Sequence, residues 1–248
     1  MEKTIMNKKK GEIQLEMKQI IVVTDGQSNI GGNPVLAAKE AKNEGVIVNA
    51  IGIIDDQSDD ALWEVEKIAQ GGGGIWENTM IKELGQTMHA VTQKTINKTI
   101  ETIVGKQLKQ IIGTDLENIP PKERSKIIDY MDKISEEIEI KCCIVMDCSG
   151  SMKNKMAVAR QSIIELMNSL KGRKGRNEIA IIAYPGEDGE CTKVISNFTQ
   201  DIQKIKEKVF LLKASGTTPT AAAINHAISL FKQDVSISEE VLLEESMV

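Results

Sequence analysis

Short apolar runs alternate with amphipathic segments along most of the chain. Residues 19–24 form one such run, without the alternation of apolar and polar positions that a half-exposed strand shows. A run of this kind is typical of a parallel strand that is covered on both faces. The expected strands cover residues 19–24, 46–53, 75–77, 139–146, 178–184 and 193–197.

Helices are expected between these strands. Asn33 and Pro34 are typical of an N-cap followed by proline at the first helical position, and Gly45 is the expected end of that helix. Ser58 is the expected N-cap of a second helix, which ends at Gly71. Further helices are expected at residues 96–111, 122–136, 156–170, 201–212 and 219–232. Strands that alternate with helices predict an α/β fold, with a mostly parallel sheet and helices on both faces.

Composition narrows the class of protein. The 248 residues are 41% hydrophobic and 27% charged, as in ordinary globular proteins, and no apolar run approaches the ~18 residues of a membrane span. A net charge of −5 and an aromatic content of 3% argue against general nucleic-acid binding. The adjacent Cys142 and Cys143 suit neither a zinc site nor a disulfide framework, and residues 1–16 lack the apolar segment of a signal peptide. These features predict a cytoplasmic protein.

Oxygen-bearing side chains follow two of the expected strands. Asp147, Ser149 and Ser151 alternate along the loop after residues 139–146, so that all three side chains can point inward. The sequence Thr-Asp-Gly, with Asp25 at its centre, begins at the last residue of the run 19–24. The carboxyl ends of parallel strands share one edge of a sheet, which is where such sheets bind ligands. Short oxygen-bearing side chains on such loops suit Mg²⁺, which takes six oxygen ligands.

An apolar strand that ends in Asp-x-Ser-x-Ser resembles the first strand and metal loop of a von Willebrand factor A (VWA) domain. A strand that ends in Thr-Asp-Gly resembles the fourth strand of the same fold. The resemblance implies a Rossmann-like VWA fold with one antiparallel edge strand and a metal-ion-dependent adhesion site. It also places a threonine ligand in residues 215–220, where Thr218 is the assigned residue and Thr217 the alternative. The implied site residues are Asp147, Ser149, Ser151, Thr218 and Asp25, and the implied ion is Mg²⁺, with Mn²⁺ possible.

The two halves of this resemblance occur in reversed order. We therefore expect one circularly permuted domain instead of two incomplete ones. Its parts are an N-terminal extension, disordered or non-native (1–17, with Met1 or Met17 as the start), the C-terminal half of the VWA fold (18–112), a helical linker that joins the old termini (113–138), the N-terminal half with the metal loop (139–234) and an acidic tail (235–248). A closed monomer is favoured, and a dimer of chains that exchange halves is the alternative.

The resemblance implies a non-enzymatic module whose ion accepts an Asp or Glu carboxylate from a partner protein. Acidic residues on the surrounding loops, which are expected to favour cations there, are Asp55, Asp56, Glu187 and Asp188. The alternative is an accessory subunit of an AAA+ ATPase of the chelatase or MoxR type, since the chain lacks a Walker A motif of its own. The short VWA proteins of endospore-forming bacteria are similar, which suggests a link to sporulation.

Two alternatives apply to the Asp147 loop, and the basic segment 171–176 also allows two interpretations. Asp147 and the serines after it also suit the capped start of a helix. A metal-dependent phosphohydrolase with Asp147 as nucleophile needs a second acid two residues further on, where Ser149 stands. The basic residues 171–176 predict a solvated turn, with a docking or nucleic-acid patch as the alternative.

Overall fold

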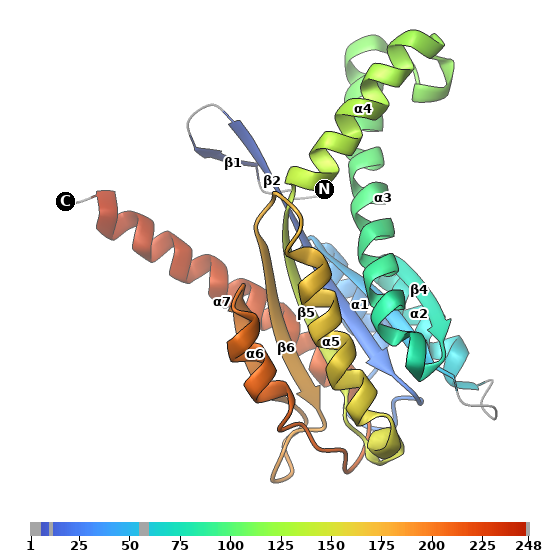
Figure 1. Cartoon of the computed structure of the whole chain (residues 1–248), viewed down its shortest axis with the longest axis vertical. Helices are drawn as coiled ribbons and strands as arrows, with labels where there is room; N and C mark the ends of the chain where they lie inside the picture. The colour runs from blue at the N-terminus through green and yellow to red at the C-terminus, as the bar shows by residue number, and fades with distance from the viewer. Residues whose placement is uncertain (1–5, 10–11, 55–59, 247–248) are drawn as a thin grey trace.

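The computed structural model describes residues 6–9, 12–54 and 60–246. Its centre is a sheet with the strand order β4-β3-β2-β5-β6-β7 (Figure 1). The strands of this path are β2 (Glu12–Thr24), β3 (Val46–Ile53), β4 (Gly73–Thr79), β5 (Glu139–Asp147), β6 (Asn177–Tyr184) and β7 (Lys193–Thr199). Neighbours from β4 to β6 pair in parallel, whereas β7 pairs with β6 in the antiparallel direction. The predicted fold class is confirmed.

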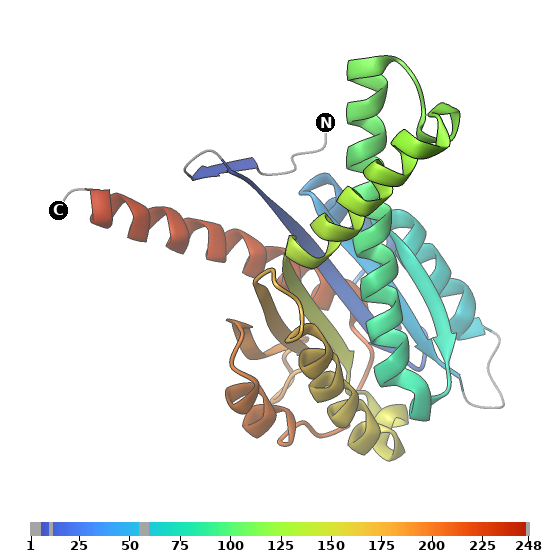
Figure 2. The ribbon, with the colours of Figure 1, turned by 45° about the horizontal axis from the view of Figure 1, so that its top comes forward.

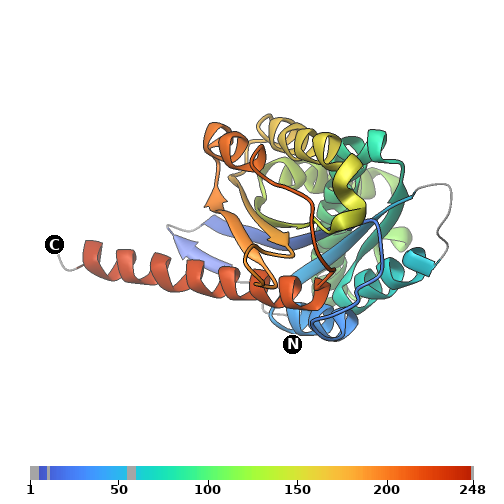
Figure 3. The same cartoon turned by 90° about the horizontal axis from the view of Figure 1, so that it is seen from below.

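Helices cover both faces of the sheet (Figure 3). The α-helices are α1 (Pro34–Asn43), α2 (Asp60–Gly72), α3 (Leu84–Ile112), α4 (Pro121–Glu137), α5 (Met156–Leu170), α6 (Ile202–Val209) and α7 (Thr220–Ser246). Short 3₁₀ helices are η1 (Ile81–Glu83), η2 (Leu116–Asn118) and η3 (Gly150–Asn154). Buried residues of α3, α5 and α6 pack on one face, and those of α1, α2 and α7 pack on the other.

The continuous apolar runs follow from this two-sided cover. Along β5, Cys142 and Ile144 belong to the core under α3 and α5, whereas Cys143 and Val145 belong to the core under α1 and α7. Successive side chains of a strand point to opposite faces, so every position must be apolar when both faces are covered. The two cysteines are therefore packing residues, and burial raises the pKa of the Cys142 thiol to about 12.

The helix boundaries agree with the local signals. Asn33 caps α1, because its side chain accepts hydrogen bonds from the amides of Val35 and Leu36, and Pro34 is the first helical residue. Helix α2 ends at Gly72, one residue later than expected. Its predicted cap, Ser58, lies outside the described residues.

Both ends of the chain differ from expectation. Residues 12–18 extend β2 beyond the expected strand at 19–24, and β1 (Met6–Lys9) pairs with this extension in the antiparallel direction. Met17, which was considered as a possible start, is buried in the core under α3. Apolar and polar residues alternate through residues 12–17, which is the pattern of a half-exposed strand. Helix α7 continues to Ser246, since neither glycine nor proline interrupts the sequence after residue 232.

The predicted linker, residues 113–138, contains η2 and α4. Helix α4 pairs with the end of α3, and this helical pair stands away from the sheet (Figure 2). The basic segment 171–176 holds the carboxyl end of α4, because the amides of Lys174 and Gly175 both donate to the Glu136 carbonyl, at 3.1 and 2.9 Å. The Arg173 guanidinium also donates to the carbonyls of Ser135 and Ile138. These contacts give the basic segment a structural role at the entry to β5.

Candidate metal centre

Three loops meet at the carboxyl edge of the sheet. They follow β2, follow β5, and precede α7. The Gly150 amide donates to the Gly216 carbonyl at 3.3 Å, and the Ser215 amide donates to the Cys148 carbonyl at 2.7 Å. Gly216 has a φ of 81°, a conformation that favours glycine. The backbone therefore fixes the loop that contains Thr218 against the loop that contains the two serines.

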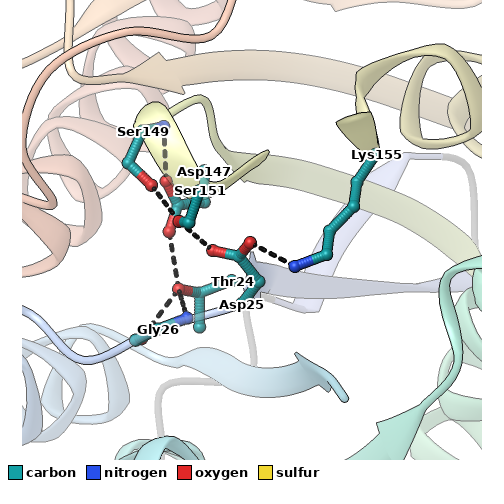
Figure 4. Close-up of polar contacts among 7 residues, drawn as sticks. All are labelled: Thr24, Asp25, Gly26, Asp147, Ser149, Ser151 and Lys155. Carbon is teal, nitrogen blue, oxygen red and sulfur yellow. Dashed lines mark hydrogen bonds and ion pairs between the residues drawn. The ribbon is translucent and has the colours of Figure 1, made fainter. Parts of the chain in front are cut away.

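Asp147, at the end of β5, is fully buried. Figure 4 shows its contacts with Thr24 and Ser149. Its Oδ2 accepts a hydrogen bond from the Thr24 hydroxyl at 2.6 Å, and its Oδ1 accepts one from the Ser149 amide at 2.8 Å. Burial raises the pKa of Asp147 to about 6, while hydrogen bonds from Thr24 and Ser149 lower it and the charge of Asp25 raises it. The two hydrogen bonds thus leave the buried charge incompletely compensated, and a nearby cation would stabilise it.

The serines connect Asp147 to the second carboxylate. Ser149 Oγ and Ser151 Oγ lie 3.1 Å apart, and the Ser151 hydroxyl donates to Asp25 Oδ1 at 2.6 Å. The other oxygen of Asp25 accepts a hydrogen bond from Lys155 Nζ, also at 2.6 Å. Figure 4 shows these groups gathered around the end of β2. Four of the five predicted residues are therefore joined in one hydrogen-bonded network, through the Ser149 amide and through the side-chain oxygens.

The donor set fits a hard divalent cation. Mg²⁺ binds oxygen at about 2.0–2.1 Å in an octahedron, which places neighbouring ligand atoms about 3 Å apart. The 3.1 Å between the two serine oxygens matches this spacing. Ser151 directs its proton to Asp25, so its oxygen lone pairs remain available to an ion. No group of three or more His, Cys, Asp or Glu side chains suited to a metal occurs among the described residues, so the network offers chiefly oxygen from hydroxyls and two carboxylates.

Asn29 ties the backbone of Thr218 to the loop that follows β2. The Thr218 amide donates to Asn29 Oδ1 at 2.9 Å, and the Asn29 amide donates to the Thr218 carbonyl at 3.2 Å. The hydrogen bonds described for Thr218 involve its backbone and not its hydroxyl, so its role as a ligand stays a prediction. Thr218 is buried, whereas the alternative, Thr217, is exposed and lines a neighbouring cavity of about 400 Å³.

That cavity contains part of the expected acidic rim. Glu187 and Asp188 line it, but Glu187 is paired with Lys193, whose Nζ lies 2.7 Å from the carboxylate. The other two expected rim residues, Asp55 and Asp56, lie outside the described residues.

Three residues of the site were not assigned a role from the sequence. Thr24 lies in the Thr-Asp-Gly motif, whose position next to Asp25 is the signal that was available. Asn29 and Lys155 contact Thr218 and Asp25 across more than a hundred residues of sequence, so nothing local marks them. These contacts exist only because the fold brings distant loops to one edge of the sheet.

Comparison with known sequences identifies the family of the chain. Two sequence models of the von Willebrand factor type A domain match the chain, one at residues 2–109 and one at residues 142–243. The chain belongs to the von Willebrand factor type A domain family. Members of this family bind a divalent metal ion and act as adhesion and protein-interaction modules.

Particular relatives cover nearly the whole chain. It is 34% identical over 221 residues to the uncharacterized protein YabS of Bacillus subtilis (strain 168), covering 88% of this chain and 90% of YabS. A crystal structure of an uncharacterized protein from Alicyclobacillus acidocaldarius is 31% identical, with a TM-score of 0.82, and the match covers 91% of this chain and 97% of that one. Over the described residues, no helix has both the length and the apolar character needed to cross a membrane.

Proposed function

We propose that this chain is a non-enzymatic, Mg²⁺-dependent protein-binding module. The proposed site residues are Asp147, Ser149, Ser151, Thr218 and Asp25. A bound ion would supply a Lewis-acidic position at the sheet edge that accepts an Asp or Glu carboxylate of a partner protein. The observation that carries the proposal is the hydrogen-bonded network that joins four of these residues, with the serine oxygens spaced as neighbouring ligands of one ion.

The surrounding residues support binding more than catalysis. Asp147 is buried and accepts a hydrogen bond from the Ser149 amide, so it positions the serine loop and is not exposed to a substrate. A hydrolase needs a general base near the ion, and both histidines contact hydroxyls elsewhere, His89 with Ser169 and His226 with Thr192. No acid stands two residues after Asp147, which weakens the phosphohydrolase alternative.

We also propose that the domain is one circularly permuted VWA fold. The family matches occur in two separate segments, and β2 from the first pairs in parallel with β5 from the second. In the unpermuted order, the chain would pass from α7 into β2. Lys141 Nζ contacts Glu16, at the start of this pairing, and also Asp234 of α7, so these two points lie near one another. A short connection would therefore close the conventional order.

Capture of binding partners on the immobilised chain tests the function. Partner proteins should bind with Mg²⁺ and be released by a chelator, and Asp147→Ala should abolish capture. Retention of the same partner by the variant and in chelator would contradict the proposal. Recovery of an AAA+ ATPase would favour the accessory-subunit alternative, and phosphate-ester turnover lost in Asp147→Asn would favour a hydrolase.

Thr218 provides a second test that needs no partner. Thr218→Ala should weaken Mg²⁺ binding about tenfold or more, because it removes one direct ligand of the ion. Thr217→Ala is the matched control, one residue away and exposed. Isothermal titration with Mg²⁺ measures both. Equal affinities for the Thr218 variant and the wild type would remove Thr218 from the site.

A further inference from the structure

Lys155 places a fixed positive charge inside the candidate metal centre. It lies in the turn between η3 and α5, and its Nζ is 2.6 Å from Asp25 Oδ2. The Lys155 side chain is 11% exposed and that of Asp25 is fully buried, so solvent screens this ion pair weakly. The other oxygen of Asp25 accepts the Ser151 hydroxyl. One carboxylate is thus shared between a metal-ligand candidate, Ser151, and the Lys155 ammonium (Figure 4).

The charges of this group set what the site prefers to bind. Asp147, Asp25 and Lys155 together carry a net charge of −1 when all three are ionised. A divalent ion changes that sum to +1, and one carboxylate from outside returns it to zero. Without Lys155, the divalent ion alone would neutralise the two aspartates. At separations of a few Å inside a protein, interactions between such charges exceed thermal energy several-fold.

We propose that Lys155 couples binding of the ion to binding of the partner's carboxylate. The ammonium repels the ion and so weakens binding of the metal alone, while it leaves the loaded site with an excess positive charge that attracts a carboxylate. Linkage requires that each ligand strengthens the other by the same factor. This inference rests on the proposed function. It implies that occupancy of the site by the ion depends on the presence of a partner carboxylate.

Mn²⁺ with acetate as a carboxylate probe tests the coupling. Free Mn²⁺ is measured by electron paramagnetic resonance while the protein is titrated, in chloride and in acetate at equal ionic strength. A protein-free titration corrects for association of Mn²⁺ with acetate. In the wild type, acetate should increase the affinity for Mn²⁺. In Lys155→Met, the affinity in chloride should rise by about tenfold and the effect of acetate should shrink.

Lys155→Arg is the matched control because it keeps the charge, and it should behave like the wild type. If the wild type binds Mn²⁺ but Lys155→Met binds it no more tightly and shows the same acetate effect, the coupling is refuted while the metal site stands. If the wild type binds no Mn²⁺ in either salt, both the coupling and the proposed function fail.

The uncharged variant also leaves Asp25 buried without its ammonium partner. If Lys155→Met is unfolded in chelator, Mn²⁺ is added and refolding is measured by circular dichroism. Refolding by Mn²⁺ supports the proposal, because the ion then supplies the missing positive charge. Failure to refold, together with the same failure in Lys155→Gln, would overturn it.

Discussion

Replacement of Asp147 by Asn should stabilise the metal-free protein. Burial raises the pKa of this carboxyl from its ordinary value of 3.8 to about 6, so the folded protein holds the charge less well than the unfolded chain does. A shift of about two pKa units at 1.36 kcal/mol each corresponds to roughly 3 kcal/mol of folding free energy at neutral pH. Asn carries no charge and removes this cost.

The local hydrogen bonds can accept the amide. The Asn oxygen can accept from the Ser149 amide, as Asp147 Oδ1 does. The Asn Nδ2 can donate to the Thr24 hydroxyl oxygen, because that hydroxyl also has the Gly26 carbonyl within reach, at 3.0 Å, for its own proton. We therefore expect a gain of about 2–3 kcal/mol in the free energy of unfolding.

Urea unfolding in chelator at about pH 7.5 measures this gain, with Asp129→Asn on the exposed face of α4 as the control. Because the folded-state pKa is raised, stability of the wild type should fall as pH rises from about 4 to about 6, and the advantage of the variant should grow over that window. Excess Mg²⁺ should stabilise the wild type and not the variant. A variant that is less stable than the wild type in chelator would refute the reasoning about burial.

Three further predictions concern the scaffold. Lys141→Met should lower the free energy of unfolding by about 2–3 kcal/mol, because it removes the cation that the carboxylates of Glu16, Glu178 and Asp234 share. The loss should be smaller in high salt, which urea unfolding at two salt concentrations measures. Gly175→Ala should lower the free energy of unfolding by about 1–3 kcal/mol, since the new Cβ would overlap the carbonyls at the end of α4. Gly105→Ala should raise it by up to about 1 kcal/mol in the same assay, because Gly105 lies within α3 with open space around it. A chain reordered as residues 139–234, a short Gly-rich linker and residues 16–112 should fold and bind Mn²⁺. A circular dichroism spectrum of an unfolded chain would count against the permuted domain. For the original chain, a light-scattering mass of twice 27.3 kDa would favour a dimer that exchanges halves.

The sheet was predictable because its strands report their burial directly. In β5 the adjacent residues Ile144 and Val145 are buried in the cores on opposite faces of the sheet, so the sequence shows an uninterrupted apolar run. The added strand residues 12–18 were missed, since their alternating pattern predicts a half-exposed strand and is a weaker signal than a continuous apolar run. The extent of α7 was missed because charge and polarity suggested a loose tail, while the absence of a helix breaker allows the helix to continue.

The spacing of residues predicted the part of the site that lies on one loop, whereas Asp25, 126 positions from Ser151, was predicted only through the resemblance to the VWA family. Asp147, Ser149 and Ser151 sit on one loop, and their spacing alone brings them together. The ion pair of Lys155 with Asp25 joins residues 130 positions apart, and a lysine in a turn has no local pattern that predicts a buried partner. Contacts of this kind are set by the packing of the loops, which the sequence of any one loop does not contain.

A Mn²⁺ soak of crystals of the wild-type chain, with an anomalous difference map, tests the central claim most directly. We expect one anomalous peak about 2.2 Å from the hydroxyl oxygens of Ser149, Ser151 and Thr218, with the carboxylates of Asp147 and Asp25 on the protein side of the ion. Absence of a peak at this edge of the sheet, or a stronger peak at other residues, would contradict the assignment of the metal centre.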